Sequence, residues 1–528
     1  MNQVSVSRRR FLQAGVGLTA ATLGGFSNPG YLAAAETPGV DKDNQLPHAS
    51  WKKLPRWRGF NLCEKFTLAG NQPFKEDDFR NISDLGFNFV RLPMDYRIWI
   101  EGDDKRKFNE QALSEIDQAV EYGQKYGVHV LINYHRAPGY TVNNPPEEQN
   151  IWKDDDILDV CRLHWQTFAK RYKGVSSDNL SFNLFNEPAG CSEEDYFRVV
   201  KTLVEGIRQE DPDRLVICDG IDWGGKPCLS FKELEVAQAT RGYAPMEISH
   251  WGANWVRSQE FPEPHWPMSS FNSLLFCVDK RETPENTRKP LTITGPFDDV
   301  DELRFTVGTV SSSAEIVVRF DGKEAFRREF ICGPGKGEWK TSTYVERYKI
   351  YSNVYDMELS VPIPKGTQKI EFATVKGDWL SVSKIKLVST NGNEAVATGV
   401  ADWNTDKQTL LKYSRDTRGQ GQGAITGGVV RDRKWLFENN VMPWLEAQKE
   451  GIGVMVGEFG AYNKTPHEIV LTWMEDMLAN WRDAGWGWAL WNFRGSFGVA
   501  DSDRADVDYD NWRGLKLDRK MLDLLQRY

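Results

Sequence analysis

Two glutamates stand where short apolar segments of the sequence end. The segment 180–185 (LSFNLF) leads into Asn186-Glu187-Pro188, and the segment 453–457 (GVMVG) leads into Glu458. Segments of this kind read as buried strands, and an α/β barrel does its chemistry at the carboxyl ends of its strands. Two carboxylates on two strand ends are the minimum equipment for cutting a glycosidic bond.

The chemistry of two such carboxylates depends on their different protonation states. Hydrolysis with retention of configuration needs a nucleophile and a proton donor about 5 Å apart, on opposite sides of the anomeric carbon. The negative charge of the nucleophile keeps the donor protonated. Once the sugar ester forms, that charge is gone, the pKa of the donor falls, and the same group can act as a base towards water.

Strand-like and helix-like segments alternate along the chain around these residues. The expected strands lie at 58–62, 87–93, 128–135, 180–187, 214–219, 247–251, 453–458 and 487–492. The expected helices lie at 111–126, 154–172, 192–210, 431–450 and 466–484, with apolar residues at helical spacing. Gly127, Gly174 and Gly485 follow helical runs, as helix-terminating residues do. Eight β/α repeats predict the α/β class and a (β/α)8 TIM barrel.

The rhythm changes between residues 251 and 431. Short alternating strands are expected at 302–307, 315–320, 344–350, 357–361 and 369–374, with Asp321-Gly322 as a hairpin turn. This pattern predicts a β-sandwich, residues 269–399, inserted into the sixth βα loop and therefore at the catalytic face. Residues 364–372 and 377–380 resemble jelly-roll carbohydrate-binding modules, which implies an insert that binds sugar. The alternative is a structural wall packed beside the cleft. The barrel would then comprise residues 36–268 and 400–528, and residues 399–428 would return to it as a long loop.

The amino terminus has the features of an export signal. Residues 7–13 (SRRRFLQ) resemble the bacterial twin-arginine motif, and a mildly apolar stretch and Ala33-Ala34-Ala35 follow. We expect residues 1–35 to be a signal peptide that is removed, and the protein to be periplasmic or extracellular without a stable membrane anchor. The alternative is a disordered basic tail.

Composition limits the other classes of function. The net charge of −9, without a basic stripe in the mature region, argues against a nucleic-acid partner. The 20 tryptophans serve either a large aromatic core or the stacking of sugar rings. The seven cysteines show no zinc-binding spacing, and Cys191 and Cys228 are the candidates for a disulfide bridge. We expect a monomer with a polysaccharide or oligosaccharide substrate, and neither a metal nor a cofactor.

Taken in order, these motifs resemble family 5 of the glycoside hydrolases, the cellulase family of clan A. Its acid/base is the glutamate of an Asn-Glu-Pro motif after strand four, which implies Glu187. Its nucleophile closes strand seven, which implies Glu458 in Val-Gly-Glu-Phe-Gly. The resemblance also assigns substrate contacts and supporting roles to six residues: Asn186 (sugar 2-hydroxyl), Arg91 (ionised nucleophile), His135 and His250 (central subsite), Trp251 and Trp491 (substrate binding, Trp491 by stacking).

One departure from the family keeps alternatives open. The family has His-x-Tyr after strand six, whereas this chain reads His250-Trp251-Gly252, so the tyrosine that donates to the nucleophile is missing at this position. The implied function is a secreted retaining hydrolase of β-glucan or a related β-glycan. A catalytically silent sugar-binding barrel is the alternative, and a metal-dependent hydrolase using His135, His250 and Asp219 is a weaker one.

Overall fold

The computed structural model describes residues 46–528, except for residues 257, 259, 260, 262, 278–289, 347, 402, 404–409 and 416–422. The predicted signal peptide therefore lies outside the described residues. Within the described part of the chain, no helix is long and apolar enough to span a membrane.

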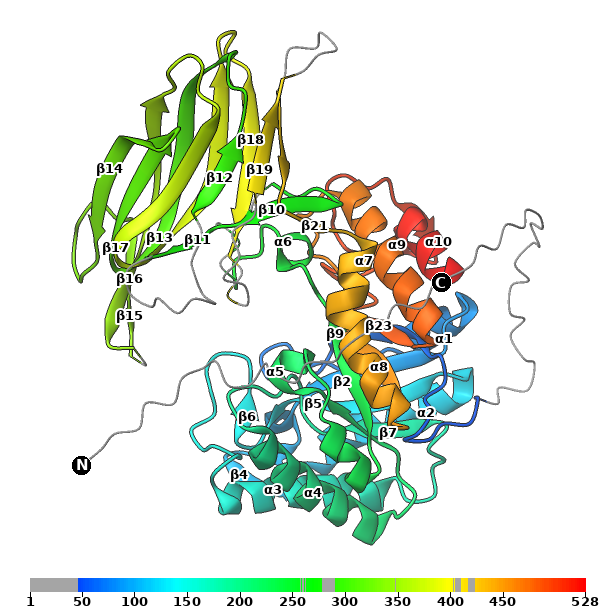
Figure 1. Ribbon diagram of the computed structural model, residues 1–528. Helices are drawn as coiled ribbons and strands as arrows, with labels where there is room; N and C mark the ends of the chain where they lie inside the picture. Colours follow the sequence, from blue (N-terminus) through cyan, green and yellow to red (C-terminus); the bar gives the residue numbers. More distant parts are fainter. Residues whose placement is uncertain are drawn as a thin grey trace, which may run out of the picture. The chain divides into compact units, whose positions relative to one another are not determined.

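Eight parallel strands close into a barrel, which confirms the predicted (β/α)8 class (Figure 1). In order they are β1 (Arg58–Asn61), β2 (Phe89–Asp95), β5 (His129–Ala137), β7 (Leu180–Asn183), β8 (Val216–Asp219), β9 (Ala237–Gly242), β22 (Val454–Phe459) and β23 (Trp488–Leu490). The ring is complete because β2 pairs with both β1 and β5, and β23 pairs with both β22 and β1. The carboxyl ends of all eight strands consequently meet at one face.

Helices follow the strands and pack their apolar faces on them (Figure 1). They are α1 (Glu76–Asp84), α2 (Glu110–Tyr126), α3 (Asp155–Arg171), α4 (Glu193–Glu210), α7 (Arg433–Leu436), α8 (Met442–Lys449), α9 (His467–Ala484) and α10 (Arg519–Arg527). A π-helical turn, Phe437–Val441, joins α7 to α8. Side chains of Asn109, Asp154 and Ser192 cap α2, α3 and α4, and Gly127 and Gly485 end α2 and α9 with positive φ. The predicted helices are confirmed.

Shorter elements complete the barrel domain. They are β3 (Ile100–Glu101), β4 (Asp104–Phe108), β6 (Tyr140–Thr141), β24 (Asp510–Trp512), β25 (Leu515–Leu517), α5 (Ile221–Gly224), α6 (Met246–Ser249) and the 3-10 turns Tyr96–Ile98 and Leu229–Leu234. Of these, β6 pairs antiparallel with the end of β5 and thereby reaches the face where the carboxyl ends of the strands meet.

The prediction of the sixth strand is wrong. Residues 247–251 form the end of α6 and a turn, and the strand between β8 and β22 is β9, ten residues earlier. Its sequence, AQATRG, lacks large apolar residues, although all six residues are buried. Gln238 is accommodated there by two bonds to the backbone of Cys228, at 2.9 and 2.8 Å.

The predicted inserted β-sandwich follows α6 in the chain. Its strands are β10 (Met268–Asn272), β11 (Leu274–Phe276), β12 (Leu291–Thr294), β13 (Val300–Phe320), β14 (Lys323–Ile331), β15 (Thr341–Val345), β16 (Ile350–Pro362), β17 (Lys369–Ser389), β18 (Glu394–Val400), β19 (Leu410–Ser414), β20 (Ala424–Gly427) and β21 (Val429–Arg431). The long strands β13 and β17 pair along their lengths, and β13 changes its other partner from β16 to β14. Their apolar side chains form a separate core.

Several details of the insert differ from expectation. The predicted strands 302–307 and 315–320 are two parts of β13, whereas the predicted strand 344–350 is divided between β15 and β16. The Asp321-Gly322 hairpin is confirmed. The loop predicted at 399–428 is wrong, because β19 and β20 lie there and extend the sheet from β12. All seven cysteines are free thiols, so Cys191 and Cys228 form no bridge.

Candidate active site

A buried arginine of the second strand reaches the glutamate of the seventh. Arg91 Nη1 donates to Glu458 Oε1 at 2.5 Å, and both side chains are almost fully buried. The remaining donors of the guanidinium are held by side-chain oxygens of three asparagines: Asn61 at 3.0 Å, Asn183 at 3.0 Å and Asn186 at 2.9 Å. The structure thus brings Arg91 and Glu458 together as predicted, in a charge-assisted contact that fixes the carboxylate.

Glu187 follows β7 in a left-handed backbone conformation, with φ of 51°. Its N–H donates to Asp219 Oδ2 at 2.9 Å, and its carbonyl accepts from Tyr140 Oη at 2.6 Å. Residues other than glycine adopt this conformation at a cost in free energy. The two bonds hold the backbone of Glu187 in this conformation and thereby set the direction in which its side chain projects. Burial raises the pKa of Glu187 to about 7, and the negative charge of Glu458 adds to the effect. Such a carboxyl group can donate a proton near neutral pH.

The oxygen and the nitrogen of the Asn186 side-chain amide differ in their hydrogen bonding. Its Oδ1 accepts from both Arg91 and Arg241, at 2.9 and 3.0 Å, which fixes the orientation of the side chain. Its Nδ2 is buried and has no hydrogen-bond partner among the residues that the structure describes. A buried donor without a partner is costly, so this nitrogen is placed to serve an acceptor on a ligand.

Arg241, at the end of β9, is the residue that sequence analysis missed. Its Nε donates to Glu187 Oε1 at 3.1 Å, and its Nη2 contacts Glu458 Oε1 at 3.3 Å and also bonds Asp219. A single guanidinium therefore joins both catalytic candidates. Burial by itself would lower the pKa of Arg241, but the carboxylates of Asp219, Glu458 and Glu187 hold it above its usual range. Arg241 is a permanent cation in this site.

Tyr243 supplies the hydroxyl that the sequence analysis did not find. It follows β9 directly, and its Oη donates to Glu458 Oε2 at 3.2 Å. Burial and then the charge of Glu458 raise the pKa of Tyr243 well above its ordinary value, so the group stays a donor. The prediction that the tyrosine is missing is therefore wrong, because it depended on the wrong sixth strand. Placing that strand at 237–242 gives Arg241-Gly242-Tyr243, with arginine where the family has histidine.

His135 and Trp491 lie on one side of the site. His135 is buried near the end of β5, its ring is 5.8 Å from that of Trp491, and Phe66 contacts both rings at 4.4 and 5.4 Å. Burial, followed by the charges of Arg91 and Arg241, holds the pKa of His135 well below its usual range. The imidazole is thus neutral, and its Nδ1 lies 3.2 Å from the amide of Asn143.

A cavity of about 340 Å³ continues from this aromatic group. Its lining combines apolar and charged side chains: Phe66, Thr67, Leu68, Ala69, Asp95, Arg97, Arg136, Asn143 and Asn144. Arg97 makes a forked contact with Asp95, and Arg136 lies 3.7 Å from the same carboxylate. Apolar faces beside fixed polar groups suit a sugar ring.

The predicted residues after α6 are less central. His250 caps the end of α6, its Nδ1 lies 2.8 Å from Ser249 Oγ, and its ring is 5.2 Å from that of Tyr243. Burial lowers its pKa to about 4. Trp251 is half-buried in the next turn and has neither a hydrogen bond nor a ring contact with the site among the described residues. The structure thus brings His250 to the edge of the site and leaves Trp251 apart.

The metal alternative finds no support in this geometry. In the part of the chain that the structure describes, no group of three His, Cys, Asp or Glu side chains could hold a metal ion. The carboxylate of Asp219 is occupied by the side chains of Arg241 and Asn183 and by the backbone of Glu187.

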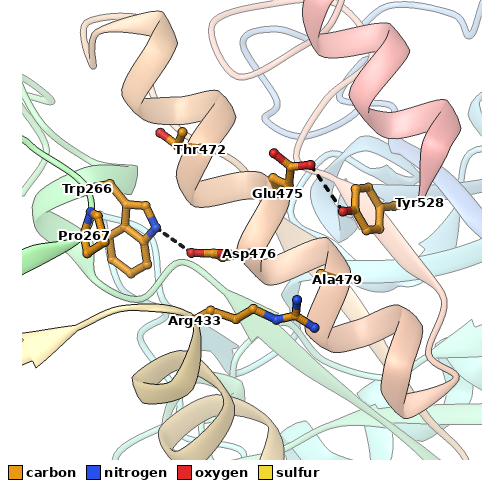
Figure 2. A pocket seen from close by; sticks show the side chains of 8 residues that line it. All are labelled: Trp266, Pro267, Arg433, Thr472, Glu475, Asp476, Ala479 and Tyr528. Carbon is orange, nitrogen blue, oxygen red and sulfur yellow. Dashed lines mark hydrogen bonds between the residues drawn. The ribbon is translucent and has the colours of Figure 1, made fainter. Parts of the chain in front are cut away.

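A second cavity, of about 320 Å³, lies beside α9 (Figure 2). Its lining residues are Trp266, Pro267, Arg433, Thr472, Glu475, Asp476, Ala479 and Tyr528. Its polar groups already pair with one another, for example Trp266 Nε1 with Asp476 at 2.9 Å and Tyr528 Oη with Glu475 at 3.3 Å. None of the site residues lines it.

Part of the barrel is similar to known proteins. Residues 47–258, which include strands β1 to β9, match the model of Cellulase (glycosyl hydrolase family 5). This part of the barrel is thus similar to glycosyl hydrolase family 5. Cellodextrinase A of Ruminococcus flavefaciens is 27% identical over 187 residues, which are 34% of this chain and 55% of that protein. Endoglucanase C of Acetivibrio thermocellus is 27% identical over 195 residues, 35% of this chain and 54% of that protein.

The similarity to these two family 5 relatives is partial, since the chain spans about half the length of each. A solved structure described as a glycoside hydrolase extends further. It is 25% identical, covers 89% of this chain and 99% of its own, and superposes with a TM-score of 0.57.

Proposed function

We propose that this protein is a retaining glycoside hydrolase that cleaves β-glycosidic bonds in a β-glucan or a related β-glycan. The observation that carries the proposal is the pair Glu187 and Glu458, which project from β7 and β22 and are joined by one guanidinium. The names of the cellodextrinase and endoglucanase relatives support a β-glucan as the substrate.

In the first step, an oxygen of Glu458 bonds to the anomeric carbon while the bond from that carbon to the leaving oxygen breaks. Glu187 gives its proton to the leaving oxygen, which departs as a hydroxyl group. Glu187 is suited to this role because burial and Glu458 hold its pKa near 7. The unpaired Nδ2 of Asn186 would donate to the hydroxyl next to the anomeric carbon.

In the second step, Glu187 is a carboxylate and takes a proton from water. The water oxygen bonds to the anomeric carbon, the bond to Glu458 breaks, and Glu458 leaves as a carboxylate. Configuration is retained because two inversions occur. Arg91 and Tyr243 receive the carboxylate as it forms again, each on a different oxygen.

The test uses substrates that separate the two roles. The dinitrophenolate of a dinitrophenyl β-cellobioside leaves without needing a proton. With this substrate, Glu187→Ala should therefore retain the first step and lose the second. Azide should then restore turnover and give a β-glycosyl azide, whereas Glu458→Ala with azide should give the α-anomer. The matched control is Glu247→Gln, a buried glutamate that pairs with Arg431 outside the site. Wild-type rates in either alanine variant would overturn the assignment.

We propose further that residues 1–35 direct export through the twin-arginine route and are removed after Ala35. The observation is the motif at residues 7–13 and the small residues before Glu36. Replacing Arg8 and Arg9 by lysine should leave the protein in the cytoplasm of a bacterial host. Secreted wild-type protein with an intact amino terminus would contradict cleavage at this point.

A second candidate function concerns the insert, for which we propose sugar binding. Trp403 is 61% exposed, and its ring contacts those of Trp379 and Phe276 at 5.0 and 6.0 Å. Exposed aromatic faces stack on pyranose rings. Trp379→Ala with Trp403→Ala should weaken retention by β-glucan in affinity electrophoresis. Trp339→Ala, whose indole bonds Gly335 in the same domain, is the control, and equal retention of all three proteins would dismiss the role.

A further inference from the structure

Arg241 occupies a position that the surrounding backbone leaves open for it. A Cβ atom on Gly457 would lie 2.8 Å from Nη1 of Arg241, and one on Gly224 would lie 2.8 Å from its Cγ. Both glycines belong to neighbouring elements, β22 and α5. A side chain at either position would displace the guanidinium, so the wall of the barrel is shaped around this arginine.

The contacts of Arg241 divide into an anchor and a shared pair. Nη2 bonds Asp219, a fully buried aspartate at the end of β8, and the Oδ1 of Asn186. The same guanidinium lies against Oε1 of Glu187 and Oε1 of Glu458. Asp219 thus fixes the position of the guanidinium, and the positive charge of this guanidinium also acts on the two catalytic carboxyl groups.

We infer that Arg241 is a positioning residue that serves both carboxylates in turn. Its positive charge stabilises the carboxylate of Glu458 in the free enzyme and that of Glu187 once Glu458 has become an ester. This inference rests on the proposed function. In the free enzyme, Glu458 is a carboxylate and competes with Glu187 for the guanidinium. When Glu458 becomes an ester it loses its charge, and of the two catalytic carboxyl groups Arg241 then acts on Glu187 alone. The carboxylate form of Glu187 is favoured at the moment when it must take a proton from water.

The other groups that face Glu187 do not supply this exchange. Arg91 of β2 is bound by Glu458 and three asparagines, and His135 of β5 is held neutral by its low pKa. Tyr140 of β6 and Tyr243 after β9 are neutral donors with raised pKa values, and Asp219 of β8 adds negative charge. Among these described neighbours, Arg241 is the cation that contacts both carboxyl groups.

The inference is tested by the pH dependence of hydrolysis in Arg241→Lys, Arg241→His and Arg241→Met. Loss of the positive charge should raise the pKa of Glu187 by about 1–3 units, the usual effect of an adjacent arginine. For Arg241→Met, the alkaline limb of kcat/KM should move up by this amount, and kcat at neutral pH should fall because Glu187 is no longer ionised in the second step. Arg241→Lys keeps a positive charge beside Glu187 and should therefore move the alkaline limb less than Arg241→Met does.

Arg214→Lys is the matched control. Arg214 is likewise a buried arginine paired with an aspartate, Asp211, but it lies before β8 at the opposite end of the strands. Its variant should keep the pH limbs of wild type. Because removing a buried charge partner destabilises a fold, Arg241→Met is also combined with Asp219→Asn. In this double variant the alkaline limb should move less than in Arg241→Met, because the negative charge of Asp219, which raises the pKa of Glu187, is lost as well.

The outcomes separate the inference from the proposed function. Limbs that stay in place in Arg241→Met, with a uniform loss of rate, would overturn the inference and leave a structural role. The pKa of Glu187 is also measured directly, by ¹³C NMR of carboxyl-labelled glutamate with Glu187→Gln for assignment. A shift of that signal in a protein that hydrolyses no β-glycan would retain the electrostatic role and overturn the proposed function.

Discussion

Replacing Tyr243 by phenylalanine should slow the second step of the reaction more than the first. The phenol donates to Glu458 Oε2 at 3.2 Å, which is long for a hydroxyl donor. A bond to a charged acceptor contributes about 1.5–3 kcal/mol, and this length places it near the lower value. The negative charge on Glu458 disappears in the first step and returns in the second. The bond therefore strengthens only towards the second transition state, where interactions of this kind raise kcat.

A loss of about 1.5 kcal/mol corresponds to roughly a tenfold lower kcat, with a smaller change in kcat/KM. The assay is stopped-flow release of dinitrophenol from a β-cellobioside, in which the steady-state rate should fall while the initial burst persists. Tyr413→Phe is the matched control, since Tyr413 donates to Asp299 at 3.1 Å within the insert. An equal loss in kcat and kcat/KM, or none, would refute the reasoning.

Three further results are expected. Asn186→Ala should lower kcat/KM about tenfold or more on β-glucosides but much less on 2-deoxy analogues. The 2-deoxy analogues lack the hydroxyl to which the unpaired Nδ2 of Asn186 would donate, so equal losses on both substrates would contradict this. The pKa of Glu187 is raised from 4.5 to about 7, so as the pH rises between these values the unfolded chain loses this proton first and the stability of the native state falls. Glu187→Gln should therefore exceed wild type in Tm by more at pH 8 than at pH 5, and a constant difference in Tm would contradict this. Arg97→Ala should weaken cleavage of long oligosaccharides but not of short aryl glycosides if the cavity beside Phe66 holds a sugar, and parallel losses would exclude it.

The barrel and most of its site could be predicted because their signals are local. Glu187 and Glu458 each follow a strand that is apolar enough to recognise, and Arg91 and His135 lie on strands of the same kind. Each long helix carries its own apolar spacing and, in most cases, a capping residue. Family motifs then assign the roles, and the structure places Arg91 in contact with Asn186 and Glu458, while Glu187 is joined to Glu458 through Arg241.

The sixth strand could not be found in this way, and with it Arg241 and Tyr243 were missed. Ala237–Gly242 contains no branched apolar residue, while the following Met246–Ser249 contains an isoleucine and a methionine in a short helix. Burial of Gln238 is possible because the backbone of Cys228 satisfies its amide, and burial of Arg241 because Glu187 and Asp219 pair with it. A pattern of hydrophobicity does not contain those partners. The one available signal was the tyrosine two positions after an arginine, at the point where the family motif requires a tyrosine.

The conformation of Glu187 depends on equally distant residues. Proline at 188 disfavours helical backbone for the residue before it, yet Glu187 takes a left-handed φ. Asp219 accepts from its N–H, Tyr140 donates to its carbonyl, and Arg241 holds its side chain, so three separate strands determine one residue. Asp219 is shared between the strained backbone and the cation. The geometry of the proton donor and the charge that tunes its pKa are therefore coupled through a single carboxylate that need never touch the substrate.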